Sequence, residues 1–338
     1  MKNITYLLGA GASAQKLPVV SEMPTRIRKT IAKLKVRQGN ASYTPLKRSP
    51  IPNEGSLKSL YGDLIDALEW LAYACDAHAS IDTFAKKLTI TGQYSVLRKL
   101  KITTSAYFAL EQELRGFDNR YDAFFASVIS ASGSFPERLR ILSWNYDNQL
   151  EMAYSGFNNG LDSVSDNALG LRMKTKFSRP RSTTGFCVVK LNGQCGFQEA
   201  NGLTQYNFVD NITNGSDLDS IDTVLLNYGI ATYGLNVYPT LSFAWEEEKN
   251  TQIRIVDTAV AETKDTNILV VIGYTFPFFN REIDRAILDS MPNLEKVYYQ
   301  DPYASKLINR IQAVKSETNN LEIIPYEDKD QFFLPYEL

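Results

Sequence analysis

Six short apolar runs predict buried β-strands. Continuous stretches of Val, Ile and Leu bounded by turn residues are typical of strands that helices cover on both faces. The runs lie at residues 3–8, 138–144, 186–192, 267–274, 295–300 and 321–326. Helical patterns follow the fourth and the fifth of them. The alternation of strands and helices predicts an α/β fold built on a parallel sheet.

A second pattern, with apolar residues three and four positions apart, fills the region between the first two predicted strands. This spacing is typical of amphipathic helices. It is clearest in KSLYGDLIDALEWLAYAC, where leucines recur at Leu60, Leu64, Leu68 and Leu71. The region from about residue 25 to 135 is therefore expected to be largely helical.

Together the two patterns predict one domain with a Rossmann-like, six-stranded parallel sheet and an inserted helical module. The Rossmann-like core is expected at about residues 1–24, 136–192 and 250–330 of the 338-residue chain, and the helical insertion at about 25–135. A second, irregular insertion is expected at about 197–245. The polar stretch 156–184, rich in Gly, Ser and Asn, is predicted to be a surface loop.

The charge balance gives no sign of a nucleic-acid-binding protein. The formal net charge is −2, so no overall basic field favours polyanions. The segment Thr25–Asn40 is locally basic. We interpret it as a solvated helix face, with a partner or nucleic-acid surface as the alternative. Direct nucleic-acid binding is not expected.

Cysteine content and hydropathy predict a cytoplasmic protein without a structural metal. The three cysteines, Cys75, Cys187 and Cys195, include no C-x-x-C pair, which excludes a four-cysteine zinc site within this chain. No disulfide framework is indicated. We expect no signal peptide, since the first strand begins almost at Met1. No apolar run approaches the ~20 residues that span a bilayer.

A glycine turn follows the first predicted strand. In LLGAGASA, Gly9 and Gly11 come directly after the apolar run, and Ser13 follows. Glycine permits a sharp turn and lets a pyrophosphate approach the backbone. The third glycine of G-x-G-x-x-G is replaced by Ala14, so an ordinary strand–helix turn is an equally good interpretation of this motif alone.

Small and hydrogen-bonding residues recur at the ends of the other predicted strands. Because ligands of doubly wound sheets bind at the carboxyl ends of the strands, this recurrence predicts a shared nucleotide cleft. The simpler alternative for Asn145 and Asp147 is that they cap the following helix. The residues in question are Ser143, Asn145 and Asp147, then Asn192 and Gly193, then Gly273, Tyr274 and Thr275, and finally Gln300 and Asp301.

Four motifs in this order resemble those of the sirtuin-like NAD-consuming family, and more narrowly its bacterial antiphage NADase branch. They are GAGAS, SWNYD, VVKLNG and VVIGYTFPFFNREIDRAI, and the helical segment ASIDTFAKKL is similar to a signature of that branch. The resemblance implies that NAD is bound as a substrate and hydrolysed to nicotinamide and ADP-ribose, which defends against phage by depleting NAD. It also implies a protein partner, such as a HerA-like ATPase, an Argonaute or another nucleotide-processing sensor, or a homo-oligomer.

The resemblance also implies a role for each motif residue. Asn145 is expected beside the nicotinamide ribose and Asp147 at the nicotinamide amide. The pyrophosphate is expected on Gly9, Ala10, Gly11 and Ser13, the adenosine ribose or phosphates on Gly273 and Thr275, and the adenine ribose near Gln300 and Asp301, with Ser143 and Gly193 also contacting the dinucleotide.

One residue departs from the family pattern. Where relatives carry K-L-H-G, this chain has Lys190-Leu191-Asn192-Gly193, and an asparagine cannot accept a proton near neutral pH. The chain is therefore either a NADase impaired at Asn192 or a module that senses NAD or ADP-ribose without cleaving it. A protein deacylase is disfavoured because the cysteine set of the sirtuin zinc ribbon is missing.

Other residues of the motifs have simpler interpretations. The single histidine, His78, could replace the missing base, but a surface or interface position near a helix start is the better expectation. The aromatic residues Phe276, Phe278 and Phe279 are predicted to pack in the core and in a turn rather than to form a stacking platform.

Overall fold

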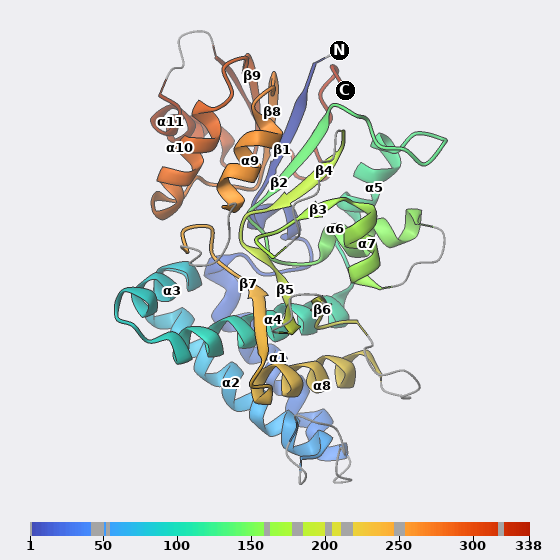
Figure 1. Ribbon diagram of the computed structural model, residues 1–338, viewed down its shortest axis with the longest axis vertical. Helices are drawn as coiled ribbons and strands as arrows, with labels where there is room; N and C mark the ends of the chain where they lie inside the picture. The colour runs from blue at the N-terminus through green and yellow to red at the C-terminus, as the bar shows by residue number, and fades with distance from the viewer. Residues whose placement is uncertain are drawn as a thin grey trace.

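A parallel sheet of seven strands forms the centre of the described structure (Figure 1). The computed structural model describes residues 2–41, 51, 55–158, 163–177, 185–199, 205–210, 219–246, 254–316 and 321–338. The strands are β1 (Ile4–Leu8), β2 (Leu139–Ser143), β3 (Met173–Lys174), β4 (Cys187–Lys190), β8 (Ile268–Ile272), β9 (Lys296–Gln300) and β10 (Glu322–Tyr326), in the spatial order β10-β9-β8-β1-β2-β4-β3.

All six predicted strands are present, but the predicted strand number was wrong. The seventh strand, β3, is only two residues long and pairs at the sheet edge with β4. It lies in the stretch 156–184, which was predicted to be a loop and which also contains η3 (Ser155–Phe157) and α7 (Val164–Gly170). Counted along the chain, the six predicted strands lie in the order 3-2-1-4-5-6 of doubly wound sheets.

Helices cover both faces of the sheet because successive strand side chains point to opposite faces. On one face Tyr6 and Leu8 of β1 pack with α5 (Asn119–Val128) and α6 (Gln149–Tyr154). On the other face Leu7 belongs to a second cluster. That cluster includes side chains of α9 (Ile255–Thr263), α10 (Arg281–Asp289) and α11 (Ala304–Val314).

A separate hydrophobic core lies below the carboxyl ends of the strands in Figure 1. We call the elements around it the helical half. They are α1 (Met23–Asn40), α2 (Leu57–Ala77), α3 (Ile81–Ile90), α4 (Tyr94–Arg115), α8 (Ser220–Tyr233) and a three-stranded sheet of β6 (Gln205–Asn207), β5 (Gly193–Glu199) and β7 (Val237–Leu241). The expectation of irregular structure over about 197–245 was therefore wrong for the residues described there.

Local sequence explains where helices of this half begin and end. The Ser56 hydroxyl accepts the N–H of Ser59 at 3.2 Å and starts α2. Ser80 does the same for α3, accepting the N–H of Thr83 at 3.1 Å. Gly116, at φ +71°, ends α4 in a conformation that glycine adopts without strain. These signals fix the starts of α2 and α3 and the end of α4.

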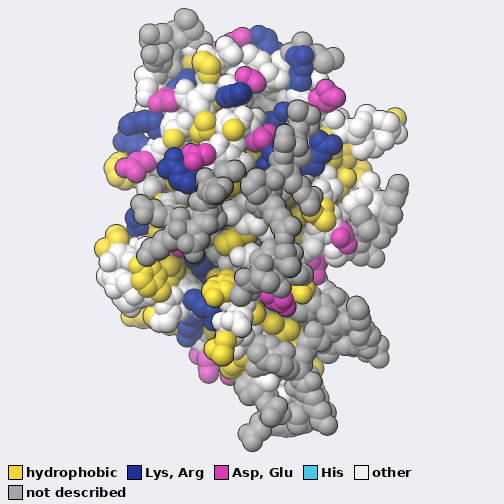
Figure 2. Space-filling view, in the orientation of Figure 1, with side chains coloured by type: hydrophobic (Ala, Val, Ile, Leu, Met, Phe, Trp, Pro, Cys, Tyr) yellow, Lys and Arg dark blue, Asp and Glu magenta, His cyan; other side chains and the backbone are white. Residues whose placement is uncertain are grey.

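The basic segment on α1 is engaged within the protein itself. Arg26 lies 3.4 Å from the buried carboxylate of Glu111 on α4, and Arg37 pairs at 2.7 Å with Asp219, which caps α8. In Figure 2, basic and acidic side chains alternate over the visible described surface of the sheet half.

Three further observations concern the described residues only. None of their helices combines the length and the apolar composition needed to cross a bilayer. No three of their His, Cys, Asp or Glu side chains are grouped so that they could hold a metal ion. The three cysteines are free thiols.

Candidate functional site

The parallel register brings the predicted site residues to one edge of the sheet. Leu8 of β1 pairs with Ser143 of β2 and with Ile272 of β8, so the segments that follow these residues are neighbours. The carboxamide of Asn145 crosses from β2 to β1 and donates to the carbonyl oxygen of Gly9 at 2.9 Å. Its nitrogen also lies 3.4 Å from the hydroxyl of Ser13.

Asn145 is not a helix cap. Helix α6 begins four residues later, at Gln149, and the Asn145 side chain bonds the glycine turn of another strand. Among the described residues no donor bonds its Oδ1. Asn145 is 9% exposed, so this oxygen is the polar atom of the side chain that is available to a ligand.

The glycine turn packs directly on the turn that follows β8. The N–H of Gly11 donates to the Gly273 carbonyl at 2.9 Å, and the N–H of Gly9 donates to Ile272 at 3.0 Å. A Cβ on Gly11 would lie 2.6 Å from the Cα of Gly273. This crossing explains both glycines, and it engages two of the amides that the phosphate prediction requires. A pyrophosphate would have to be held by other groups of the turn.

Replacing Gly11 with alanine is expected to lower the free energy of unfolding by about 1–3 kcal/mol, because the new methyl group meets backbone atoms that cannot move aside cheaply. The matched control is Gly39→Ala in α1, where a Cβ meets nothing within 4 Å. That change is expected to stabilise the protein by about 0.5–1 kcal/mol. Urea unfolding of both variants measures the contrast, and equal effects would contradict the packing explanation.

Ser13 and Asp147 form a buried pair behind the glycine turn. The Ser13 hydroxyl donates to Asp147 Oδ2 at 2.9 Å and lies 3.0 Å from the hydroxyl of Tyr121. Asp147 Oδ1 accepts the N–H of Gln149 at 3.1 Å. Asp147 is not the N-cap of α6, which is Asn148, but its carboxylate bonds the first helical N–H and also fixes Ser13. Burial raises the pKa of the Asp147 carboxyl, while the charge of Lys190 opposes the rise.

Lys190 is a buried cation that holds the segment after β2. Its ammonium group donates to Glu151 at 2.6 Å and to the backbone carbonyl of Asp147. Both side chains are almost fully buried, and burial raises the pKa of Glu151 against the effect of Lys190. Removing either partner would leave an uncompensated buried charge. The lysine of the K-L-N-G motif thus has a positional role.

Asn192 is locked by backbone bonds on both sides. Its Nδ2 donates to the Trp144 carbonyl at 3.0 Å, and its Oδ1 accepts the N–H of Ala244 at 3.1 Å. The residue is 5% exposed. The next residue, Gly193, has φ +67°, and a Cβ there would meet the Thr240 carbonyl. At position 192 the chain therefore has an amide whose oxygen and nitrogen each already make a hydrogen bond.

The residues expected to hold the adenine ribose, Gln300 and Asp301, bond other parts of the protein. The Gln300 amide donates to the carbonyls of Asp328 at 2.7 Å and Gln331 at 2.6 Å, and its oxygen accepts the N–H of Phe333 at 2.9 Å. The side chain therefore clamps the C-terminal segment, and it has no free polar atom for a ribose. Asp301 accepts the N–H of Tyr303 at 2.9 Å near the start of α11, and burial raises its pKa.

The remaining predicted residue on this side is Thr275. Its backbone carbonyl accepts a bond from the Arg310 guanidinium at 2.8 Å. The bond ties the turn after β8 to α11 and adds a positive charge beside it. A phosphate at this turn would therefore meet a guanidinium group.

The prediction that the aromatic residues after β8 pack inside the protein was right for Phe276 and wrong for Phe278. Phe276 is buried, whereas Phe278 is 83% exposed and Phe279 is 42% exposed. The backbone explains the difference, because Pro277 leads into the 3-10 turn η4 (Phe278–Asn280), which turns Phe278 outward. The guanidinium of Arg281 lies 5.7 Å from the Phe278 ring centre.

Sequence reasoning missed Arg120 of α5, which is buried beside the glycine turn. Its Nη2 donates to the carbonyls of Ala12 at 3.0 Å and Gly11 at 3.2 Å, and the guanidinium pairs with Asp118 at 2.7 Å. It also reaches the Lys329 carbonyl at 3.2 Å. Nothing in the helical pattern NRYDAFF separates this arginine from a surface residue, so the sequence carried no usable signal.

Asp82 of the ASIDTF motif was also missed. No other described residue donates to its carboxylate, and burial raises its pKa to about 6. Burial is the main cause of the raised pKa values of Tyr146 and Tyr274, which follow β2 and β8, and the charge of Asp82 adds a smaller contribution. The ASIDTFAKKL motif could have drawn attention to Asp82, its only carboxylate.

His78 lies at the end of a helix rather than at the start of one, and it is half-buried. It ends α2, with Nδ1 2.9 Å from the Ala74 carbonyl. Its ring stacks on Phe84 at 4.3 Å between centres. These contacts account for the residue without a catalytic role.

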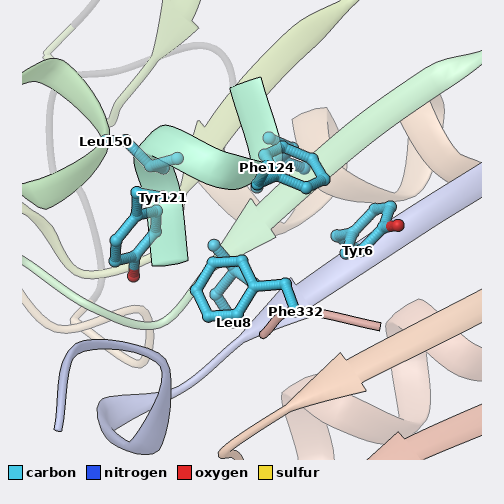
Figure 3. Close-up of a pocket in the computed structure, with 7 residues that line it drawn as sticks. Tyr6, Leu8, Tyr121, Phe124, Leu150 and Phe332 are labelled. Atoms are coloured by element: carbon cyan, nitrogen blue, oxygen red, sulfur yellow. The ribbon is translucent and has the colours of Figure 1, made fainter. Parts of the chain in front are cut away.

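A small cavity lies on the α5 face of the sheet (Figure 3). Its lining is apolar and aromatic, and the space cannot hold one water molecule. It is a packing gap rather than a nucleotide site. The lining residues are Tyr6, Leu8, Tyr121, Phe124, Ile141, Leu150 and Phe332.

We compared the chain with protein-family models and with curated proteins. No family model matches the chain, and no curated protein matches it. The sirtuin-like resemblance therefore rests on the four motifs.

Proposed function

We propose that the chain binds NAD at the carboxyl edge of the sheet, as a sirtuin-like NAD-consuming protein impaired at Asn192. The observation that carries this proposal is the Asn145 carboxamide. It is held against Gly9 at the centre of the sheet while its oxygen is left without a partner among the described residues. The strand order supports the proposal, because dinucleotides bind where the order of a doubly wound sheet reverses, beside β1.

The chemistry of the site would be cleavage of the bond between nicotinamide and ribose. Its transition state has oxocarbenium character, so the protein must orient the ribose and stabilise positive charge at the anomeric carbon. Asn145 would hold the ribose hydroxyls or the attacking water. Asp147 would supply negative charge nearby, although its carboxylate already accepts from Ser13 and Gln149.

The second candidate is a module that binds NAD or ADP-ribose without cleaving it. The observation that favours it is the locked amide of Asn192, which bonds Trp144 and Ala244 and has no basic nitrogen. In both candidates the protein would act in defence against phage, with a nucleotide-processing partner or a second copy of itself. We propose a cytoplasmic location, where NAD is available.

Titration calorimetry of the chain with NAD tests the binding that both candidates share. We expect a one-to-one complex with NAD or ADP-ribose, since both carry the ribose that Asn145 is expected to hold. Nicotinamide alone is the control and is expected to bind at least tenfold more weakly. No binding of NAD or of ADP-ribose at about 1 mM would reject the nucleotide assignment.

A further inference from the structure

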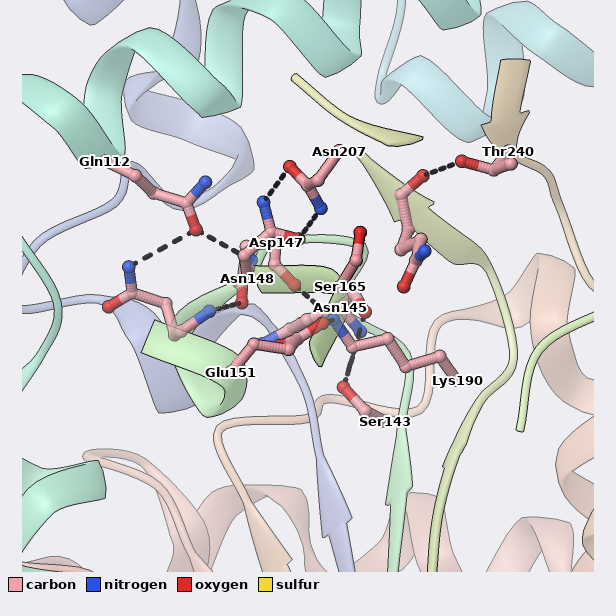
Figure 4. A network of polar contacts seen from close by, with 12 residues as sticks. Gln112, Ser143, Asn145, Asp147, Asn148, Glu151, Ser165, Lys190, Asn207 and Thr240 are labelled. Carbon is pink, nitrogen blue, oxygen red and sulfur yellow. Dashed lines mark hydrogen bonds and ion pairs between the residues drawn. The ribbon is translucent and has the colours of Figure 1, made fainter. Parts of the chain in front are cut away.

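The segment that carries Asn145 and Asp147 is fixed from the helical half by a pair of buried amides (Figure 4). Asn148 Nδ2 donates to Asn207 Oδ1 at 2.9 Å, and Asn207 Nδ2 donates to Asn148 Oδ1 at 2.9 Å. Asn148 is fully buried and Asn207 is 1% exposed. A reciprocal amide pair fixes both the separation and the relative orientation of the two side chains, because each amide has one donor and one acceptor engaged.

A second amide of the helical half holds the same segment through its backbone. The Oε1 of Gln112, on α4, accepts the N–H of Asn148 at 2.7 Å. Gln112 is fully buried. Asn148 is therefore held at its backbone by α4 and at its side chain by β6, one residue after Asp147.

The partner residue Asn207 is itself tied to α8. The Asn227 amide of α8 donates to the carbonyls of Phe208 at 2.9 Å and Asp210 at 3.0 Å, and it lies 3.4 Å from that of Asn207. The backbone around β6 therefore follows α8, which packs in the core of the helical half. A chain of buried hydrogen bonds runs from α8 to the strand end that presents Asn145.

We propose that the Asn148–Asn207 pair is a positioning element, which sets the ligand-binding geometry of Asn145 from the helical half. This inference rests on the proposed NAD binding. Buried polar groups without a partner are costly, so the pair strongly favours one arrangement of the segment. The two asparagines need not touch NAD. They act through the three-residue distance between Asn145 and Asn148.

A double-mutant cycle on NAD affinity tests the pair. Asn148→Ala and Asn207→Ala are each expected to raise the Kd for NAD about tenfold, as the loss of one buried hydrogen-bonded contact implies. The double variant is also expected to raise Kd about tenfold, not a hundredfold, because the second change removes nothing more. Additive effects, or an unchanged Kd in either single variant, would overturn the proposal.

Asn167→Ala is the matched control for a merely structural effect. Asn167 is as buried as Asn207, and the bonds of its amide include one from Asn158 and one to the Ser163 carbonyl at the start of α7. The control is expected to lose stability while it keeps the parental Kd. A control that weakens NAD binding as much as Asn207→Ala would show that general destabilisation is the cause.

Hydrogen exchange at the Asn148 and Gln149 amides separates this inference from the proposed function. Both amides have side-chain acceptors in the structure, Gln112 and Asp147. Without NAD present, Asn207→Ala is expected to speed their exchange, and Asn167→Ala is not. Unchanged exchange would overturn the inference even if NAD binds, and faster exchange would sustain the positioning role even if NAD does not. If Asn207→Ala does not fold, Asn207→Ser provides the same comparison.

Discussion

Replacing Asn145 with alanine is expected to abolish detectable NAD binding and any turnover. The change removes a side chain that joins the end of β2 to the Gly9 carbonyl, at 2.9 Å, and that leaves an oxygen for the ribose. The fold is expected to survive, since the loss of a single neutral hydrogen bond costs about 1 kcal/mol. Calorimetry with NAD and thermal unfolding of the same preparation measure the two quantities separately.

The matched control is Asn267→Ala, which lies at the amino ends of the strands, just before β8. There the Asn267 side chain also joins two strands, accepting the N–H of Asn3 at 3.0 Å. The control is expected to lose comparable stability and to bind NAD as the parent does. An Asn145→Ala variant that melts lower yet binds NAD normally would mean that Asn145 serves only to connect β1 and β2.

Replacing Asn192 with histidine is expected to raise nicotinamide release by ~10²–10⁴-fold, the usual contribution of a general base. An imidazole can take a proton from a ribose hydroxyl or from water near neutral pH, whereas the present amide cannot. The exchange also removes the amide bridge between Trp144 and Ala244. We therefore expect a loss of about 1 kcal/mol in stability together with the gain in activity.

The pH profile identifies the histidine as the base. A base must be unprotonated to accept a proton, so release by the Asn192→His variant is expected to rise with pH through about 6.5, the ordinary histidine pKa. Asn192→Ala is the control. It loses the same bridge without gaining an imidazole, and it should be destabilised and no more active than the parent. The two variants are compared by measuring nicotinamide release from about pH 5 to about pH 9, a range that includes this pKa.

Equal rates for the parent and the Asn192→His variant would show that position 192 does not supply the base. Asp82 would then be the next residue to change, because no other described residue donates to its carboxylate. Burial raises its pKa to about 6. Activity that depends on ionised Asp82 would rise with pH through that value, and Asp82→Asn would remove the rise.

The sheet was predictable because its strands carry an unbroken apolar signal. All six runs became strands. Five of them are mostly buried, so their side chains are apolar on both faces, whereas the edge strand β10 is partly exposed. The edge strand β3 escaped detection because two residues in a polar stretch carry no pattern. The three-stranded sheet around β5 was missed for a related reason, as its Gly, Asn and Gln residues resemble a loop.

The site was predictable in position more than in detail. Parallel strands must end at a common edge, so the meeting of Asn145 with Gly9 and Ser13 followed from the strand ends alone. The hydrogen-bond partners of these polar side chains could not be predicted from the strand ends. The clamp of Gln300 on the C-terminal segment depends on residues that pack there only in the folded chain. Two-sided locking of Asn192 likewise requires Ala244, which is distant in sequence.

The central place of β1 has a consequence for how the chain folds during synthesis. Ile4 pairs with Leu139 on one side and with Ile268 on the other. The first strand to be synthesised therefore pairs with strands that are synthesised much later. Contacts this distant in sequence slow folding, whereas helices α1 to α4 can associate locally. Until β8 emerges, β1 presents an open apolar edge of the kind that promotes aggregation. Fragments that stop before β8 are therefore expected to be recovered as insoluble protein.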